Sequence, residues 1–300
     1  MDDLQYGYGD NEARSNRLKD HLGNVRLTFT AKPEVDEWNA DYEADTGTQF
    51  EYYNEAVRIN SEVFDHTNVG STHYSGRLNG TLKERFGLAK SLKVMPGDIV
   101  RAEVYAKYLD PDTAWVNGMP AFINSIVNGT APAGTFKDGG LVGSTGGVLM
   151  PFWVLFADDH DDGNDDAPKA YLNWLVFDND YNLIPSQSSY KQISTAGREY
   201  GQDGSHDLLE TELAISESGY VYLYVSNDHY ELEGEVLEVY FDDFRIEHIK
   251  SPVIQSEDFY PFGLSFNSFN RENSLINKYL YNGKEKQDAL DLGWFDYGAR

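Results

Sequence analysis

Apolar and polar residues alternate without a break over residues 100–108, which read VRAEVYAKY. A period of two is the pattern of a strand that buries one face and exposes the other. The preceding residues, Met95-Pro-Gly-Asp98, join a proline with a fixed φ to a glycine that tolerates a positive φ. The segment therefore predicts a half-buried strand that follows a tight turn.

Further strand signals lie on both sides of this segment. Two nearly continuous apolar runs, Val148–Phe156 and Tyr171–Phe177, fit central strands that are covered on both faces. The other strand signals are Val57–Phe64, Gly219–Asn227 and Val239–Ile249. Several short strands separated by turn-rich loops favour a mostly β fold and, within that class, a β-sandwich.

Three segments depart from the strand pattern. Thr113–Asn128 carries apolar residues at roughly helical spacing and predicts one short helical excursion. Residues 31–47 are polar and acidic, and they are interpreted as a connector. The acidic segment Asp158–Asp166 fails the EF-hand pattern, because Lys169 stands where that pattern needs a glutamate. A solvated charged loop is expected there.

Composition excludes several classes of function. The 300 residues hold 24 Lys and Arg against 50 Asp and Glu, and the net charge of −26 opposes binding to nucleic acid or to an anionic membrane. No apolar run approaches about 20 residues, so no membrane insertion is expected. The absence of cysteine excludes thiolate catalysis and zinc–thiolate sites. The opening residues lack the basic and apolar regions of a signal peptide, so no export signal is expected in this chain.

The two ends carry hairpin signals of a different kind. Tyr279–Glu285 contains Asn282-Gly283, a dipeptide that readily supplies a positive φ at both central positions of a turn. Leu4–Asn11 and Trp294–Arg300 are also rich in Tyr and Gly, and recurring Tyr-Gly units are a repeat signature. Repeat-type β-hairpins are therefore expected at both ends of a compact β-domain.

These ends resemble a known family. Lys19–Leu27 (KDHLGNVRL) resembles the DHLGN-R motif of the RHS repeat-associated core, which occurs in RHS/YD-repeat proteins. Asp258–Gly263, Tyr281–Glu285 and Leu292–Arg300 resemble three further motifs of that core, in the family's order. The motif residues, for which the resemblance implies a structural role, are Asp20, His21, Gly23, Asn24, Arg26, Tyr260, Pro261, Phe262, Gly263, Asn282, Gly283, Lys284, Glu285, Asp296, Tyr297, Gly298 and Arg300.

The resemblance implies a domain inserted into RHS hairpins, a layout common in Bacteroidetes. Residues 1–30 and 251–300 would be RHS-core strands. Residues 48–250 would be an inserted sandwich that resembles jelly-roll domains of the galactose-binding or carbohydrate-binding-module type. The family implies a secreted or cell-surface location, with the remaining RHS/YD-repeat shell of a parent protein as partner. Because no toxin domain is present, the resemblance implies a fragment of a toxin-associated or effector-delivery protein.

Asp242 is the strongest candidate for a metal ligand. Alternation places it on the face of Phe244 and Ile246, and a carboxylate on an apolar face needs a partner. Jelly-roll binding modules often hold a structural calcium between their first and last strands. By that resemblance, Glu62 and Asp65 would join Asp242 around the ion. The alternative is that Asp242 accepts hydrogen bonds from backbone N–H groups or from an arginine.

Tyr222 and Tyr224 are the candidate ligand-binding residues. They share one face of a predicted strand and could line a groove for surface glycans. The alternative is a place in the core or in cross-strand pairs, where aromatic residues of strands are found more often.

The sequence offers no support for catalysis. It contains no Gly-x-Ser-x-Gly elbow, phosphate-binding loop or His-Glu-x-x-His motif. It also shows no recognisable pair of carboxylates for glycoside hydrolysis, which needs a separation of about 5–9.5 Å. The predicted function is a non-enzymatic structural and recognition module of an RHS-type protein. The alternative is a glycan-binding, adhesin-like module, and a jelly-roll glycoside hydrolase or lyase is least favoured.

Overall fold

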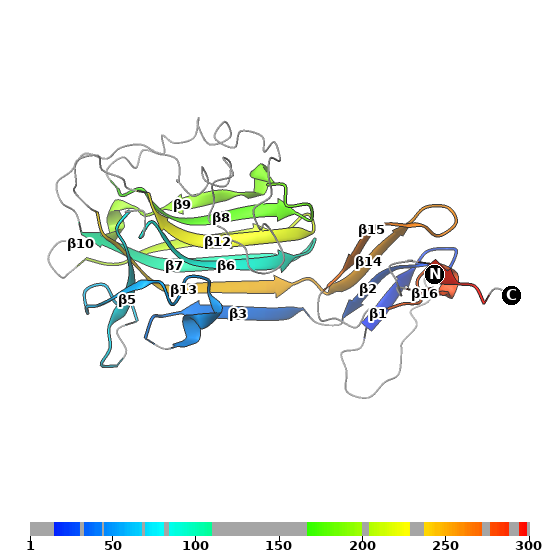
Figure 1. The fold of residues 1–300 in the computed structure, drawn as a ribbon, viewed down its shortest axis with the longest axis horizontal. Helices are drawn as coiled ribbons and strands as arrows, with labels where there is room; N and C mark the ends of the chain where they lie inside the picture. Colours follow the sequence, from blue (N-terminus) through cyan, green and yellow to red (C-terminus); the bar gives the residue numbers. More distant parts are fainter. Residues whose placement is uncertain are drawn as a thin grey trace. The chain divides into compact units, whose positions relative to one another are not determined.

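The computed structural model describes residues 15–30, 33–43, 45–67, 70–80, 84–109, 167–199, 204–228, 237–271, 277–287 and 294–298. These residues are mostly in β-strands, as predicted (Figure 1). The chain divides into unit 1 (Met1–Val35, Met95–Asp98 and Ile249–Arg300) and unit 2 (Asp36–Val94 and Ile99–His248). The predicted helical excursion, the predicted strand over Val148–Phe156 and the acidic loop lie outside the described residues.

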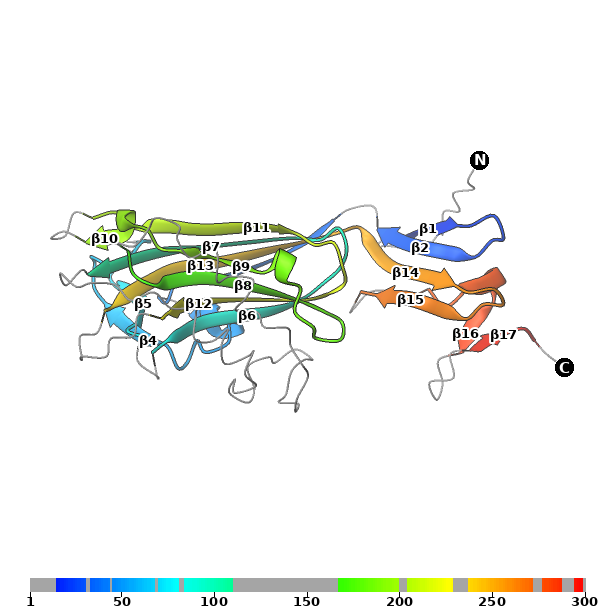
Figure 2. The ribbon, with the colours of Figure 1, turned by 90° about the horizontal axis from the view of Figure 1, so that it is seen from above.

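Unit 2 is built from two sheets (Figure 2). In the larger, seven-stranded sheet the order is β10-β7-β13-β5-β4, while β11 also pairs with β7 and β3 with β13. Its strands are β3 (Glu34–Ala40), β4 (Val57–Asn60), β5 (Tyr74–Leu78), β7 (Ile99–Leu109), β10 (Arg198–Glu199), β11 (Asp207–Ala214) and β13 (Val239–Lys250). The smaller sheet has the order β6-β12-β8-β9, with β6 (Phe86–Val94), β8 (Ala170–Asp178), β9 (Ser189–Gln192) and β12 (Gly219–Asn227).

The two sheets share one hydrophobic core, so unit 2 is a β-sandwich. One buried cluster contains residues of both sheets: Val221 and Leu223 of β12 in the smaller sheet, and Phe241 of β13 with several residues of β7 in the larger one. The β7 members of this cluster are the apolar residues of the predicted alternation, each at most 3% exposed: Val100, Ala102, Val104, Ala106 and Tyr108. The strand predicted from the period of two is therefore confirmed.

One sequence-based expectation for unit 2 is wrong. The connector expected over residues 31–47 contains β3, which pairs with β13, and the short 3-10 helix η1 (Asp45–Gln49) begins near its end. Most side chains of β3 are at least partly exposed, while Ala40 is buried and Trp38 packs against the core. An edge strand can be this polar, because it contributes few side chains to the core and charged residues discourage pairing with other chains.

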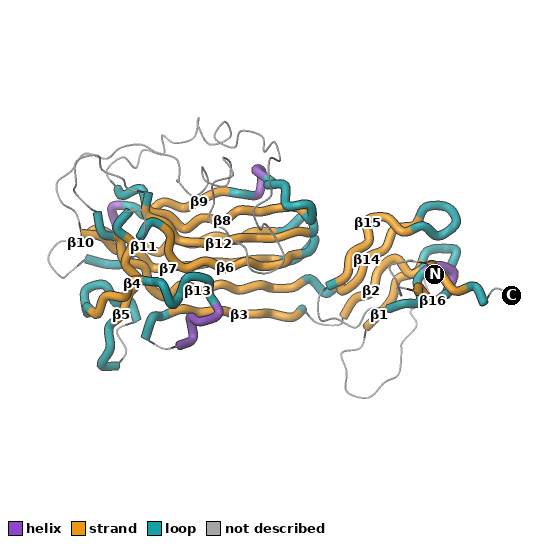
Figure 3. The backbone as a smooth tube through the Cα atoms, viewed as in Figure 1, coloured by secondary structure: helices purple, strands orange, loops and turns teal. Residues whose placement is uncertain are grey.

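Unit 1 contains a four-stranded sheet of the order β1-β2-β14-β15. Its strands are β1 (Ser15–Lys19), β2 (Val25–Thr30), β14 (Val253–Phe259) and β15 (Ser265–Asn270). The short 3-10 helix η4 (Tyr281–Gly283) precedes a two-stranded sheet of β16 (Glu285–Gln287) and β17 (Trp294–Asp296) (Figure 3). No helix within the described ranges is long and apolar enough to cross a membrane.

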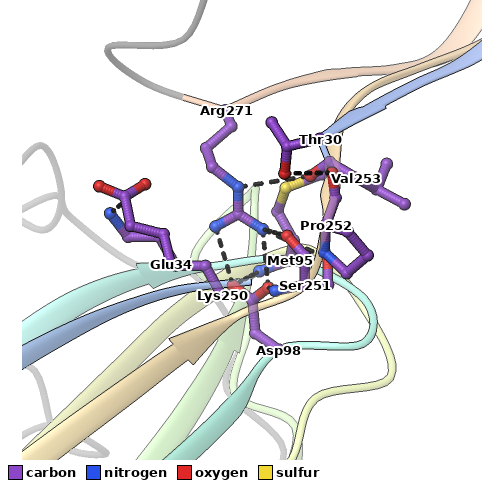
Figure 4. Close-up of polar contacts among 9 residues, drawn as sticks. All are labelled: Thr30, Glu34, Met95, Asp98, Lys250, Ser251, Pro252, Val253 and Arg271. Carbon is purple, nitrogen blue, oxygen red and sulfur yellow. Dashed lines mark hydrogen bonds and ion pairs between the residues drawn. The ribbon is translucent and has the colours of Figure 1, made fainter. Parts of the chain in front are cut away.

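The turn predicted at Met95–Asp98 belongs to unit 1. The carboxylate of Asp98 is the centre of a buried polar cluster there (Figure 4). Gly97 has φ of 84°, as the turn chemistry predicted. Asp98 is fully buried and accepts hydrogen bonds from the backbone N–H groups of Met95 at 3.0 Å and Ser251 at 2.6 Å. The Arg271 guanidinium adds two bonds, from Nη2 at 2.7 Å and from Nη1 at 3.2 Å. One carboxylate thus fastens three separate segments of unit 1.

Candidate functional site

The outer face of the larger sheet in unit 2 carries a charged groove. The polar positions of the β7 alternation, Arg101 and Glu103, lie opposite Glu212 and Glu210 of β11 in the strand register. The groove encloses about 480 Å³. Its lining comes from three strands and consists of Arg101, Ala102, Glu103, Glu210, Thr211, Glu212, Arg245 and Glu247.

Ion pairs connect the two arginines of the groove to carboxylates on neighbouring strands. Arg101 Nε lies 2.6 Å from Glu212 Oε2, and Arg245 Nη2 lies 2.6 Å from Glu247 Oε1. Longer contacts of 3.7 Å and 3.8 Å join Arg101 to Glu247 and Arg245 to Glu103. Ion pairs as exposed as these contribute only about 0–1 kcal/mol each. They can therefore be exchanged for bonds to a ligand at little cost.

One like-charge pair in the groove works against the stability of the sheet. Glu103 and Glu210 stand directly opposite each other on β7 and β11. Like charges directly opposite on antiparallel strands are destabilising. In the described part of the chain, Glu210 has no ion-pair partner, whereas Glu103 has Arg245 at 3.8 Å. A groove with four glutamates and two arginines in its lining has a local excess of acceptors.

A stacked His–Tyr pair lies further along the same face of β7. The next outward residue after Glu103 is Tyr105, and the ring of His66 stacks on it with centroids 3.4 Å apart and an interplanar angle of 12°. His66 Nδ1 lies 2.6 Å from Asp243 Oδ2, which holds the imidazole ring in place. The outward position of β7 that follows Glu103 therefore carries a ring against which His66 is fixed.

The predicted calcium ligands Glu62 and Asp65 have other partners. Asp65 accepts a hydrogen bond from Thr67 Oγ1 at 3.0 Å, and its second oxygen lies 2.6 Å from His73 Nδ1. The Glu62 side chain is 81% exposed and reaches the other nitrogen of His73 at 3.8 Å. In the structure, Glu62 and Asp65 therefore form a cluster with the imidazole of His73.

Asp242 has the partners that the alternative interpretation named. Its side chain is buried and accepts the backbone N–H groups of His66 and Asp243, each at 2.8 Å. Burial raises the pKa of its carboxyl to about 8, and the neighbouring Asp243 adds to the effect. Within the described ranges, no group of three or more His, Asp or Glu is placed to hold a metal ion. Calcium binding stays a prediction that these contacts do not support.

Tyr222 and Tyr224 share one face of β12, as predicted, with ring centroids 5.5 Å apart. Each residue is only 1% exposed, however, and both belong to a second apolar cluster with Leu175 and Phe177 of β8. Burial raises the pKa of both phenols. The expectation that these rings line an open groove is therefore wrong, and the core alternative is correct.

The groove residues were missed in the sequence. The sequence does contain a signal for them. Arg101 and Glu103 are polar positions in the alternation over residues 100–108, and Arg245 and Glu247 are polar positions of β13. Alternation predicts that such residues face outward, but it does not show which distant strands lie next to one another. The groove depends on that pairing.

The RHS-like motif residues gather in unit 1. Asp20 closes the first turn by accepting the N–H groups of Leu22 and Asn24, each at 2.9 Å. Asn24 Oδ1 then accepts the N–H of Asn282 at 2.8 Å. Asn282 and Gly283 have φ of 47° and 66°, which confirms the predicted turn. Arg26 forms an ion pair with Asp258, and Arg300 lies outside the described residues.

Comparisons with known proteins do not assign a family. No family model matches the chain, and no curated protein matches it. Solved structures that match include the CBM22-1 xylan-binding domain of Xyn10C from Paenibacillus barcinonensis (14% identical, covering 74% of this chain and 99% of that chain, TM-score 0.32). The CBM22-1-CBM22-2 tandem domain of the same protein also matches (13% identical, 79% and 53%, TM-score 0.34). The CBM22-1-GH10 modules of Clostridium thermocellum Xyn10B, complexed with xylohexaose, match as well (8% identical, 74% and 27%, TM-score 0.28).

The RHS/YD-repeat identification is therefore wrong. No family model matches the chain, and an RHS or YD-repeat model is therefore not among its matches. Turn chemistry accounts for the motifs, because Asp20, Asn24, Asn282 and Gly283 serve the local turns of unit 1. The RHS/YD-repeat shell as a partner and the association with a toxin rested on this family alone, and they lose their support with it.

Proposed function

We propose that unit 2 is a non-catalytic glycan-binding module and that the charged groove is its binding site. The observation that carries this proposal is an open cavity of about 480 Å³ on the face of a sheet, lined by two arginines and four glutamates. This volume falls within the ~300–1,000 Å³ typical of ligand sites. Side chains on paired strands are also held more precisely than side chains on loops.

The chemistry of the lining suits sugar hydroxyl groups. A hydroxyl both donates and accepts, and neighbouring hydroxyls on a sugar ring match the paired atoms of a guanidinium or a carboxylate. Arg245, with Glu103 and Glu247 around it, offers donors and acceptors side by side. The stacked ring of His66 adds an apolar surface on which a sugar face can rest. Since the existing ion pairs are exposed, a sugar can displace them without leaving a buried charge unpaired.

Arg245→Ala should lower glycan affinity at least tenfold. The variant removes the guanidinium that contacts both Glu103 and Glu247. The measurement is calorimetric titration of the full chain with neutral oligosaccharides selected from a glycan array. Lys191→Ala, an exposed cation on β9 of the other sheet, is the matched control and should bind as the wild type does. Absence of retention on every glycan, or an unchanged affinity in Arg245→Ala, would sink the proposal. Release of reducing ends would replace binding with hydrolysis.

Glu210→Lys should stabilise unit 2 and weaken glycan binding together. The substitution turns the like-charge pair with Glu103 into an opposite-charge pair, which is worth about 0.5–1 kcal/mol in the free energy of unfolding. It also places a long cation at the wall of the groove. Thermal unfolding and the same titration measure the two effects. Glu217→Lys, an exposed position with the same charge change, is the control. A fall in the melting temperature of Glu210→Lys would contradict the strain assigned to the pair.

A further inference from the structure

Three turns of unit 1 gather at one place. The turn Asp20–Asn24 contacts η4 through the bond from Asn282 N to Asn24 Oδ1, and the adjacent residues Val25 and Leu280 are joined by a bond from Val25 N to Leu280 O at 2.9 Å. The β14–β15 turn, Tyr260–Leu264, packs against the same η4, because a Cβ added at Gly263 would lie 2.7 Å from the ring of Tyr281. Tyr281 in turn packs on Phe295 of β17, with centroids 5.8 Å apart.

The side chains around these turns form an exposed apolar surface. We call it the turn surface, and its members are Leu22 (62% exposed), Tyr260 (51%), Phe262 (96%), Leu264 (70%), Tyr279 (52%), Trp294 (69%) and Tyr297 (51%). By contrast, the apolar side chains that the described part of unit 1 buries are Val25, Met95, Ile254 and Leu280. Among its described residues, unit 1 therefore exposes more large apolar side chains than it buries, and clustered exposure of this kind marks an interaction site.

Phe262 is the member that is hardest to explain for a chain on its own. Its φ is 76°, and it follows Pro261 at the second central position of the turn that the bond from Gly263 N to Tyr260 O closes at 3.1 Å. A positive φ at the second central position of such a turn favours Gly or Asn, and a bulky side chain is strained there. The ring of Phe262 is 96% exposed and gains no packing that would offset the strain. Contact with a second molecule would supply that packing.

The charge of unit 1 suits association with a copy of itself. Unit 1 contains 11 Lys and Arg and 14 Asp and Glu, so its net charge is −3, whereas the whole chain carries −26. Both signs occur beside the turn surface, as in Lys284, Glu285, Lys286 and Asp296. A basic partner would be drawn to the acidic residues of unit 2, whereas a surface of mixed sign and small net charge meets only weak repulsion from the same surface of its copy.

We infer that the chain forms a two-fold symmetric dimer in solution through the turn surface, with Phe262 at its centre. A self-complementary patch that meets its copy across a two-fold axis is the commonest way in which soluble proteins associate. The apolar side chains provide the driving force, and the aromatic members are the residue types that dominate interface energetics. A glycan is a poorer occupant, because Leu22, Phe262 and Leu264 offer no hydrogen bonds to its hydroxyls.

The test is sedimentation velocity of the full chain from 1 to 200 µM, at low salt and at 0.5 M NaCl. We expect a species of twice 33.9 kDa, and its dissociation constant should fall at high salt because screening weakens repulsion between two chains of charge −26. Phe262→Asn should raise the dissociation constant at least tenfold without unfolding unit 1, since Asn accepts a positive φ.

Leu109→Ser, at a 42% exposed apolar position of unit 2, is the matched control and should dimerise as the wild type does. A chain that stays monomeric at 200 µM in both salts overturns the inference. A dimer that Phe262→Asn leaves intact also overturns it, because the association must then use another surface. A monomer whose glycan binding falls in Phe262→Asn would assign the turn surface to glycans and equally overturn the dimer.

Discussion

Replacing Asp98 with alanine should destabilise unit 1 by about 3–5 kcal/mol, the range measured when one partner of a buried ion pair is removed. The variant leaves the Arg271 guanidinium, whose side chain is 9% exposed, without its carboxylate. It also removes the acceptor for the N–H groups of Met95 and Ser251. Hydrogen exchange over Val253–Asn270, followed by mass spectrometry, measures the effect, and protection there should fall while β12 of unit 2 keeps its protection.

A double variant separates the lost charge balance from the lost packing. Arg271→Met alone leaves Asp98 with its two backbone donors and should cost less than Asp98→Ala. Asp98→Ala combined with Arg271→Met should be more stable than Asp98→Ala alone, because no unpaired buried charge remains. Additive losses in the double variant, or a loss below about 1 kcal/mol in Asp98→Ala, would show that this carboxylate does not hold the three segments together.

Local sequence patterns predicted those features that depend on neighbouring residues. The alternation over residues 100–108 predicted β7, and Asn282-Gly283 predicted a turn with two positive φ values. The alternative set of backbone donors for Asp242 was also correct. The simple alternation that placed Asp242 on the face of Phe244 was not, because the core positions Phe241 and Phe244 are three residues apart and Asp243 between them has φ of 50°. Each correct prediction depends on the period of a strand or on the φ preference of one residue.

Features that depend on distant pairing could not be predicted. Asp98 and Arg271 are 173 positions apart, and Arg101 and Glu212 are 111 apart. β3 was missed because the residues of an edge strand need not be apolar. The RHS resemblance failed for a related reason. Short motifs of Asp, Asn and Gly identify the chemistry of a turn, and many unrelated proteins use the same turn.

The stability of unit 2 should fall as the pH rises from 6.5 to 8, with a slope of up to about 1.4 kcal/mol per pH unit for one proton. Burial raises the pKa of Asp242 from 3.8 to about 8, so the folded state holds one more proton than the unfolded state between those values. Unfolding then releases a proton, and the free energy of unfolding falls with increasing pH. Burial lowers the pKa of His206 from 6.5 to about 4, which has the opposite effect between those values. Below pH 6.5 the two groups change the free energy of unfolding in opposite directions. Above pH 6.5 only the effect of Asp242 remains.

Urea unfolding of the full chain, followed by circular dichroism at half-unit steps of pH, measures this slope. Asp242→Asn should remove it, whatever the absolute stability of the variant, because an amide does not titrate in this range. The amide can accept only one of the two backbone N–H bonds, and that loss is the same at every pH. His66→Gln and His73→Gln are the controls, since both histidines contact carboxylates in the same region. Two outcomes would show that Asp242 is ionised in the folded chain. One is a flat stability profile from pH 6.5 to 8 in the wild type. The other is a slope that survives in Asp242→Asn but disappears in a histidine variant. The buried carboxylate would then need a cation beside it, and added Ca²⁺ should raise the stability of the wild type but not of Asp242→Asn.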